Sequence, residues 1–299
     1  MVYTYTYQIE GGLKHTWNTE NKIETANEKG ELIFSKHQKK QQKSILEMIR
    51  LLITETKKRN IKIFAVSGTL LGARRNLGLI PGDDDGDFGF EMSEYPKLLE
   101  LTKIDIHPKY KFVAYDGDIG LRILNKKNIK LAQIDLFPYG TDLKDSNKVN
   151  HIGPIMNGKP IYFLQDLFPK DWMDKKCIER LEWVDFEDIK IPIPSDAENQ
   201  LHHMYGNNCM TTYVPDTRNI DGKPMHEITL KHIETLSYLT AKAYYLANLF
   251  NFNKKKNLIK PEIKMIALLT TELLDANFEN LPEEKIKRIK KIIYDYFSS

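Results

Sequence analysis

Apolar positions in the first third of the chain follow two different periods. Residues 3–9 alternate between apolar and polar side chains and predict a short strand, whereas residues 11–31 are polar and predict a loop or arm. Between residues 36 and 59 the apolar positions recur every three or four residues, as on one face of a helix. A β-type run at 61–66 follows at once, and a short apolar helix is expected over 70–75.

Strand patterns continue through the middle of the chain. Segment 84–92 alternates between aromatic side chains and acidic or glycine residues, which predicts a strand with two unlike faces. Two shorter strands are expected near residues 111–115 and 121–125, and a third over 131–137, which Pro138 should close. Together these segments predict a mixed sheet carrying helices.

The last part of the chain changes towards a helical pattern. A strand-like segment at 181–194 precedes three stretches of helical periodicity, near residues 229–250, 261–275 and 282–297. The expected fold class is therefore α+β, with a mixed β-sheet and flanking helices followed by a mainly helical C-terminal lobe. We expect an N-terminal arm, a catalytic core and a second lobe at residues 1–35, 36–140 and 141–299.

Composition narrows the class of protein. The 299 residues hold 44 Lys+Arg against 41 Asp+Glu, a net charge of +3, which argues against a nucleic-acid binder with a concentrated basic face. An apolar fraction of 41% and a charged fraction of 28% are typical of soluble globular proteins. The start lacks a secretory signal pattern, and the sequence holds no membrane-spanning apolar segment, so a cytoplasmic location is expected. The two cysteines, far apart, indicate neither a disulfide framework nor a zinc site.

Small residues mark a candidate anion site. Ser67, Gly68 and Thr69 open a helix directly after a strand, where free backbone N–H groups and small hydroxyl side chains favour a phosphate. Taken alone, this is also ordinary chemistry for the start of a helix. Its interest comes from the acidic residues that follow.

Three acids in two strands form a candidate metal site. Asp85 and Asp87 share one face of their strand because their spacing matches the strand period, and Asp135 stands among apolar neighbours in a later strand. Two adjacent carboxylates repel each other unless a cation lies between them, and carboxylate oxygens suit Mg²⁺ or Mn²⁺. The alternatives are an acidic turn for Asp83–Asp85 and a core ion pair for Asp135. The order of the small residues and the three acids within one sheet favours the metal site.

Three blocks of this sequence resemble, in order, the signature of the LicD/fukutin-related family. The first block comprises Ser67 to Ala73, Arg75, Gly78 to Pro81, Asp83, Asp84, Asp85 and Asp87. The second is Asp135-Leu136-Phe137-Pro138, and the third runs from Pro192 to Met210 with a helix that ends in Tyr205-Gly206. The resemblance covers about residues 60–215. It departs from the family at Gly82, usually Trp, and at Gly86, usually aliphatic, which puts the identity of the substrate in doubt more than catalysis.

The resemblance implies a nucleotidyltransferase-type fold and a reaction. Family members transfer a phospho-alcohol group, such as phosphocholine or an alditol phosphate, from a CDP-activated donor to a hydroxyl of a sugar or glycan, with a divalent metal. By resemblance, Gly68 and Thr69 match the Gly-Ser signature of the fold and contact the donor together with Ser67. The implied metal-binding and catalytic acids are Asp85, Asp87 and Asp135.

Other roles stay open at this stage. Arg75 falls on a family arginine and is a candidate for donor phosphate, with a salt bridge to Asp83 or Asp84 as the equal alternative. Asp83 and Asp84 are candidates for substrate binding, and either could be the general base in place of Asp135. Two rival functions also remain: nucleotidyl transfer, which attaches NMP and releases pyrophosphate, and a non-catalytic descendant that binds a nucleotide or glycan.

Overall fold

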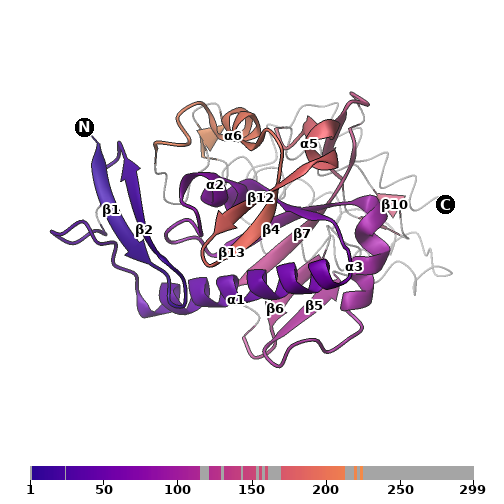
Figure 1. Cartoon of the computed structure of the whole chain (residues 1–299), viewed down its shortest axis with the longest axis horizontal. Helices are drawn as coiled ribbons and strands as arrows, with labels where there is room; N and C mark the ends of the chain where they lie inside the picture. The colour runs from indigo at the N-terminus through magenta and orange to yellow at the C-terminus, as the bar shows by residue number, and fades with distance from the viewer. Residues whose placement is uncertain are drawn as a thin grey trace, which may run out of the picture. The chain divides into compact units, whose positions relative to one another are not determined.

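A computed structural model shows a first compact unit that carries the sheet (Figure 1). The structure describes residues 2–23, 25–114, 121–128, 131–142, 144–152, 155–156, 159–160, 170–212, 219–220 and 223–224. The first unit comprises residues 1–114, 120–151 and 170–216. The predicted helices near 229–250, 261–275 and 282–297 lie outside the described residues.

The second unit comprises residues 115–119, 152–169 and 217–299. Its described parts include two short antiparallel pairs. Strand β9 (Ile155–Met156) pairs with β10 (Lys159–Pro160), and β14 (Asn219–Ile220) pairs with β15 (Lys223–Pro224).

A seven-stranded mixed sheet is the centre of the first unit. Its main order is β11-β8-β7-β4-β3, with β6 on β7 and β5 on β6. The strands are β3 (Ile63–Ala65), β4 (Asp85–Glu91), β5 (Tyr110–Ala114), β6 (Leu121–Asn125), β7 (Gln133–Thr141), β8 (Lys148–His151) and β11 (Met173–Asp174). The predicted α+β fold with a mixed β-sheet is thereby confirmed.

Strand β7 is longer than the sequence pattern suggests. It continues through Pro138 to Thr141, so the prediction that Pro138 closes this strand is wrong. On one side β7 pairs with β4 from Gln133 to Tyr139, and on the other it pairs with β6 as far as Leu136 and with β8 from Tyr139. Pro138 lies where neither antiparallel neighbour pairs with it, and a proline without an N–H is tolerated at such a position.

Helix α1 (Lys36–Lys58) covers one face of the sheet, crossing it as Figure 1 shows. Ser35 begins this helix with a capping box that Gln38 completes. Gly86 lies under the helix, and a Cβ built there would meet Ile134 Cδ1 at 2.6 Å, with Ile45 and Ile49 of α1 at 3.6 Å. Gly86 therefore faces the packed core beneath α1, on the side of β4 away from Asp85 and Asp87.

The remaining helices and a second hairpin complete the first unit. Helix α2 (Ser67–Arg75) follows β3, and a 3-10 turn (Met92–Glu94) leads from β4 into α3 (Tyr95–Leu101). Further along the chain are α5 (Lys175–Glu179), the hairpin β12 (Leu181–Phe186) and β13 (Ile189–Pro194), and α6 (Ala197–Tyr205). Among the described residues, no helix has the length and apolar character needed to cross a membrane.

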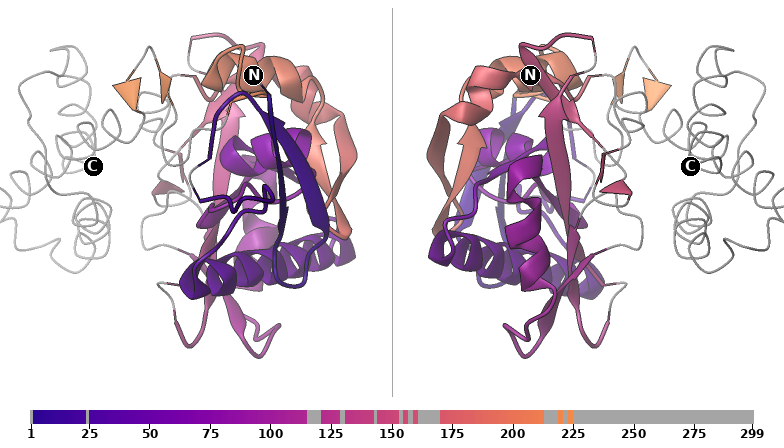
Figure 2. Two further views of the ribbon diagram at one scale, coloured as in Figure 1. Left: turned by 90° about the vertical axis from the view of Figure 1, so that its left-hand side faces the viewer. Right: turned by 90° about the vertical axis from the view of Figure 1, so that its right-hand side faces the viewer.

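The N-terminal segment is a hairpin, whereas residues 11–31 were expected to be a loop. Strands β1 (Tyr3–Gln8) and β2 (Lys14–Thr19) pair antiparallel, and Trp17 packs into the core with Tyr5 opposite it. Only one large apolar side chain occurs in β2, so its strand period is weak in the sequence. The hairpin is tied to α1 through Gly11, whose carbonyl accepts a hydrogen bond from Arg50 Nη2. Figures 1 and 2 show the indigo strands beside this helix.

Glu187 ties this hairpin to the segment that precedes β4. It sits at the turn of the β12–β13 hairpin with φ of +51° and has a fully buried side chain. Its Oε2 accepts from Leu13 N–H at 2.8 Å and lies 2.9 Å from His15 Nε2, and its Oε1 accepts from Leu79 N–H at 3.3 Å. Gly78 is required beside it because a Cβ there would collide with the carboxylate. One buried carboxylate thus joins three segments that are distant in the sequence.

Candidate active site

Strands β4 and β7 bring the three predicted acids together. The two strands are parallel and pair Asp87 with Asp135, so both side chains project from the same face of the sheet. Asp85 lies two residues before Asp87 on that face, and ligand oxygens of all three acids lie within 4.8 Å of one another. Asp87 and Asp135 are only 5% and 6% exposed. The three carboxylates that were predicted to bind one metal therefore lie together on one face of the sheet.

Two polar neighbours hold the carboxylate of Asp135. Arg122, opposite Asp135 on β6, donates from Nε to Oδ1, and Gln133 donates from Nε2 to Oδ2 at 2.8 Å. The core ion pair considered for Asp135 is thus present, and it coexists with the acid cluster. Sequence periodicity does not identify these partners, because the pairing of Arg122 depends on the register between two separate strands.

The start of α2 fixes the backbone of Asp87. Thr69 Oγ1 accepts a hydrogen bond from Asp87 N–H at 2.8 Å, and Asp87 C=O accepts from Val66 N–H at 3.1 Å. Ser67 has φ of +49°, a left-handed conformation that costs a residue other than glycine about 1 kcal/mol or more. Such strain is characteristic of functional turns. The Ser-Gly-Thr segment therefore lies directly against the acid strand.

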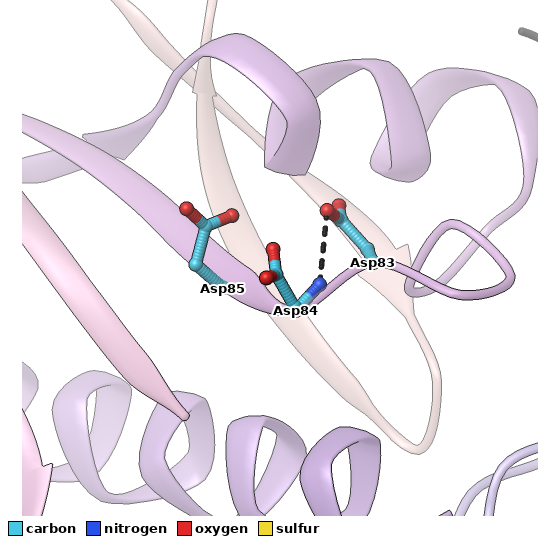
Figure 3. A group of neighbouring side chains, drawn as sticks. All are labelled: Asp83, Asp84 and Asp85. Carbon is cyan, nitrogen blue, oxygen red and sulfur yellow. Dashed lines mark hydrogen bonds between the residues drawn. The ribbon is translucent and has the colours of Figure 1, made fainter. Parts of the chain in front are cut away.

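Asp83 and Asp84 form a second acidic group with Asp85 at the entrance to β4 (Figure 3). Ligand oxygens of these three residues also lie within 4.8 Å of one another, and Asp84 N–H donates to Asp83 Oδ1 at 3.2 Å. Asp84 is exposed, whereas Asp83 and Asp85 are half-buried. Asp85 thus belongs to both groups and connects the buried cluster with the solvent-facing one.

Arg75 holds the end of α2 to the loop after α6. Its Nη1 donates to the carbonyls of Cys209 and Thr212 at 3.1 and 3.0 Å, and its guanidinium lies over the Trp17 ring at 5.0 Å. These contacts give Arg75 a structural role at the C-terminal end of α2. Phosphate binding by Arg75 stays a prediction.

Aromatic side chains extend the same face of the sheet beyond the acids. Tyr139 is fully buried, its ring stacks on His151 with centroids 5.5 Å apart, and its edge meets Phe64. Burial, with the charges of Asp171 and Asp87, raises the pKa of Tyr139 well above its usual value. Asp171, itself only 6% exposed, is therefore a further acid near this face that sequence patterns did not single out.

His151 predicts how stability depends on pH. Burial lowers its pKa from 6.5 to about 3, so between these values the unfolded chain binds a proton that the folded protein does not. Stability should therefore fall as the pH drops below 6.5, by roughly 2 kcal/mol at pH 5 from this residue. The His151→Phe variant keeps an aromatic ring. In urea unfolding, its free energy of unfolding should fall by roughly 2 kcal/mol less than that of the wild type between pH 7 and pH 5. The exposed His37→Gln control should follow the wild type; parallel curves for all three proteins would contradict the assignment.

The donor set fits a divalent cation. Three carboxylates this close repel one another, and oxygen ligands of this kind match Mg²⁺ or Mn²⁺. Backbone hydrogen bonds to Asp87 and side-chain hydrogen bonds to Asp135 orient two of the three ligands in the way that outer contacts orient metal ligands in proteins.

Comparison with known proteins identifies the domain that carries this site. Residues 60–196 match the family described as LicD/FKTN/FKRP, nucleotidyltransferase domain. The chain is 30% identical over 151 residues to an uncharacterized protein of Rickettsia typhi, covering 50% of this chain and 41% of that protein. It is 26% identical over 162 residues to ribitol-5-phosphate transferase FKTN of Mus musculus, covering 54% of this chain and 32% of the relative. The human FKTN is also 26% identical, over 166 residues, covering 55% of this chain and 32% of the relative.

The chain therefore spans about a third to two fifths of the length of these relatives. The match nonetheless includes α2 and also the two strands β4 and β7, which carry all three clustered acids. The resemblance seen in the motifs is confirmed, since residues 60–196 of this chain match the LicD/FKTN/FKRP nucleotidyltransferase domain.

Proposed function

We propose that this protein transfers a phospho-alcohol group from a CDP-activated donor to a hydroxyl of a sugar or glycan, with Mg²⁺ or Mn²⁺ as cofactor. The observation that carries the proposal is the cluster of Asp85, Asp87 and Asp135 on one face of a parallel strand pair. The FKTN relatives, which are named ribitol-5-phosphate transferases, support the phospho-alcohol class of reaction.

The three clustered acids would hold the cation, which would supply positive charge against the diphosphate of the donor. Ser67, Gly68 and Thr69 would bind the donor phosphates next to this cluster, since Thr69 already contacts the backbone of Asp87. Asp135 is our candidate for the acid nearest the attacking hydroxyl. Asp83 and Asp84, at the solvent side of the acids, are the alternatives for accepting the proton and for contacting the acceptor. Phosphoryl transfer depends mainly on positioning and electrostatics, which such an arrangement can provide.

Product analysis tests the proposal. The protein is incubated with Mg²⁺ and mixed glycan acceptors, in one series with labelled CDP-alcohols and in another with labelled CTP. We expect CMP to be released from at least one CDP-alcohol, in proportion to the phospho-alcohol transferred. Controls omit the acceptor or replace Mg²⁺ by EDTA, and both should abolish transfer.

Two other results would replace the proposal. Release of pyrophosphate from CTP would indicate a nucleotidyltransferase, which the family description of the domain makes the principal rival. Calorimetric binding of CDP-ligands without turnover, across the full panel of donors and acceptors, would indicate a non-catalytic binding protein.

A further inference from the structure

Arg122 forms an ion pair with Asp135, one of the three proposed metal ligands. The register of β6 and β7 puts the two residues opposite each other, and Arg122 Nε donates to Asp135 Oδ1. The other oxygen, Oδ2, accepts from Gln133. The Arg122 and Asp135 side chains are 18% and 8% exposed, so solvent screens this ion pair only partly. Both oxygens of this proposed metal ligand are thus engaged by the protein itself.

Charge in the cluster favours one outcome when a cation is added. Three carboxylates within 4.8 Å carry three negative charges, and Arg122 offsets one of them. A divalent cation bound there repels Arg122 and must share Asp135 with it, because both are attracted to the same carboxylate. Arg122 therefore stabilises the acids in the cation-free protein and lowers the affinity of the site for a cation.

We propose that Arg122 is an internal counter-ion that competes with the divalent cation for Asp135, so that the site takes up the cation together with a nucleoside diphosphate rather than alone. This inference rests on the proposed function and deepens it. The diphosphate adds negative charge that compensates for the guanidinium and the cation being close together. Arg122 is in this sense a positioning residue, which acts through Asp135 and sets the order in which ligands enter.

Binding of Mn²⁺ provides the test, without any need for turnover. Affinity is measured by electron paramagnetic resonance or calorimetry for the full chain, with and without CDP as the probe. The wild type should bind Mn²⁺ alone weakly and at least tenfold more tightly with CDP, in line with the usual size of coupling between two ligands. In Arg122→Gln, binding of Mn²⁺ alone should become about tenfold tighter, since a repelling charge is removed, and the enhancement by CDP should shrink correspondingly.

Two further variants control for charge and for general damage. Arg122→Lys keeps the positive charge and should remain near the wild type in Mn²⁺ affinity. Arg59→Gln breaks the ion pair between Arg59 and Glu55, two side chains that are 29% and 9% exposed, and should leave Mn²⁺ binding unchanged. In EDTA, the Arg122→Gln variant should melt at a lower temperature than the wild type. The same substitution should have little effect on the melting temperature when it is made in the Asp135→Asn variant.

The outcomes separate this inference from the proposed function. If the wild type binds no Mn²⁺ even with CDP, the metal-dependent function fails and this inference with it. If the wild type binds Mn²⁺ equally well with and without CDP, or Arg122→Gln binds it no more tightly, only the competition is overturned. The comparison of wild-type Mn²⁺ binding with and without CDP needs no variant. It therefore remains decisive if Arg122→Gln does not fold.

Discussion

Asp87→Asn is expected to reduce transfer by on the order of a hundredfold or more, although the substitution preserves the shape of the side chain. Asp87 is buried and lies opposite Asp135 in the register of β4 and β7. Carboxylate oxygens of Asp85, Asp87 and Asp135 lie within 4.8 Å of one another. Its amide would keep a carbonyl oxygen but lose the negative charge that binds a hard cation. Asp135→Ala should have an effect of similar size. Turnover is measured as CMP release with the donor that the wild type accepts.

A second measurement distinguishes loss of the site from loss of the fold. In EDTA, Asp87→Asn should melt at or above the wild-type temperature, because one of three mutually repelling charges has been removed. Addition of Mn²⁺ with CDP should raise the melting temperature of the wild type but not that of the variant. Glu55→Gln, at a buried acid on α1, is the matched control and should keep transfer intact. Wild-type turnover and Mn²⁺ binding by either Asp variant would refute the assignment of these ligands.

Glu187→Gln is expected to destabilise the protein by about 2 kcal/mol, the second large effect. Each carboxylate oxygen of Glu187 faces N–H donors: Leu79 at one oxygen, and Leu13 and His15 at the other. Glutamine offers only one acceptor oxygen, so its amino group must oppose donors on one side. The buried group left without a hydrogen bond carries the full cost of its lost hydration.

Urea unfolding monitored by circular dichroism measures the effect of Glu187→Gln. Glu182→Gln, an exposed change in the same hairpin, is the control and should stay within about 0.5 kcal/mol of the wild type. Because Leu79 lies between α2 and the acidic segment, residual transfer by the folded variant also reports on how far this contact orders the site. Equal stability of the two variants would show that Glu187 does not join these segments energetically.

The two-residue period of a strand was enough to predict that Asp85 and Asp87 lie on one face. It did not predict contacts that depend on how distant strands pair. A spacing of two residues puts Asp85 and Asp87 on one face of any strand, and the structure contains that strand. That Asp135 should meet them required a guess about neighbouring strands, which the parallel register of β4 and β7 bears out. The partner of Asp135 could not be identified in the same way, because the register of β6 against β7 is set by the whole sheet.

Two other differences have related causes. A proline ends a strand where a neighbouring strand needs its N–H, but here β6 pairs only as far as Leu136 and β8 only from Tyr139, so neither antiparallel neighbour pairs with Pro138. Strand β2 alternates between buried and exposed residues, yet His15 and Thr19 are polar, so hydrophobicity alone does not reveal it. In both cases tertiary contacts supply what the local pattern lacks.

The parallel pairing of β4 and β7 also determines when the acids can meet during folding. Parallel neighbours need a long crossover, and here β5 and β6 lie between them in the chain. Asp87 and Asp135 therefore belong to a non-local contact, of the kind that forms slowly because a large loop must close first. A chain emerging from the ribosome holds only two of the three clustered acids, Asp85 and Asp87, until β7 has been made. Cation binding would thus be a property of the completed sheet, and Mn²⁺ added during refolding would report the closure of this one strand pair.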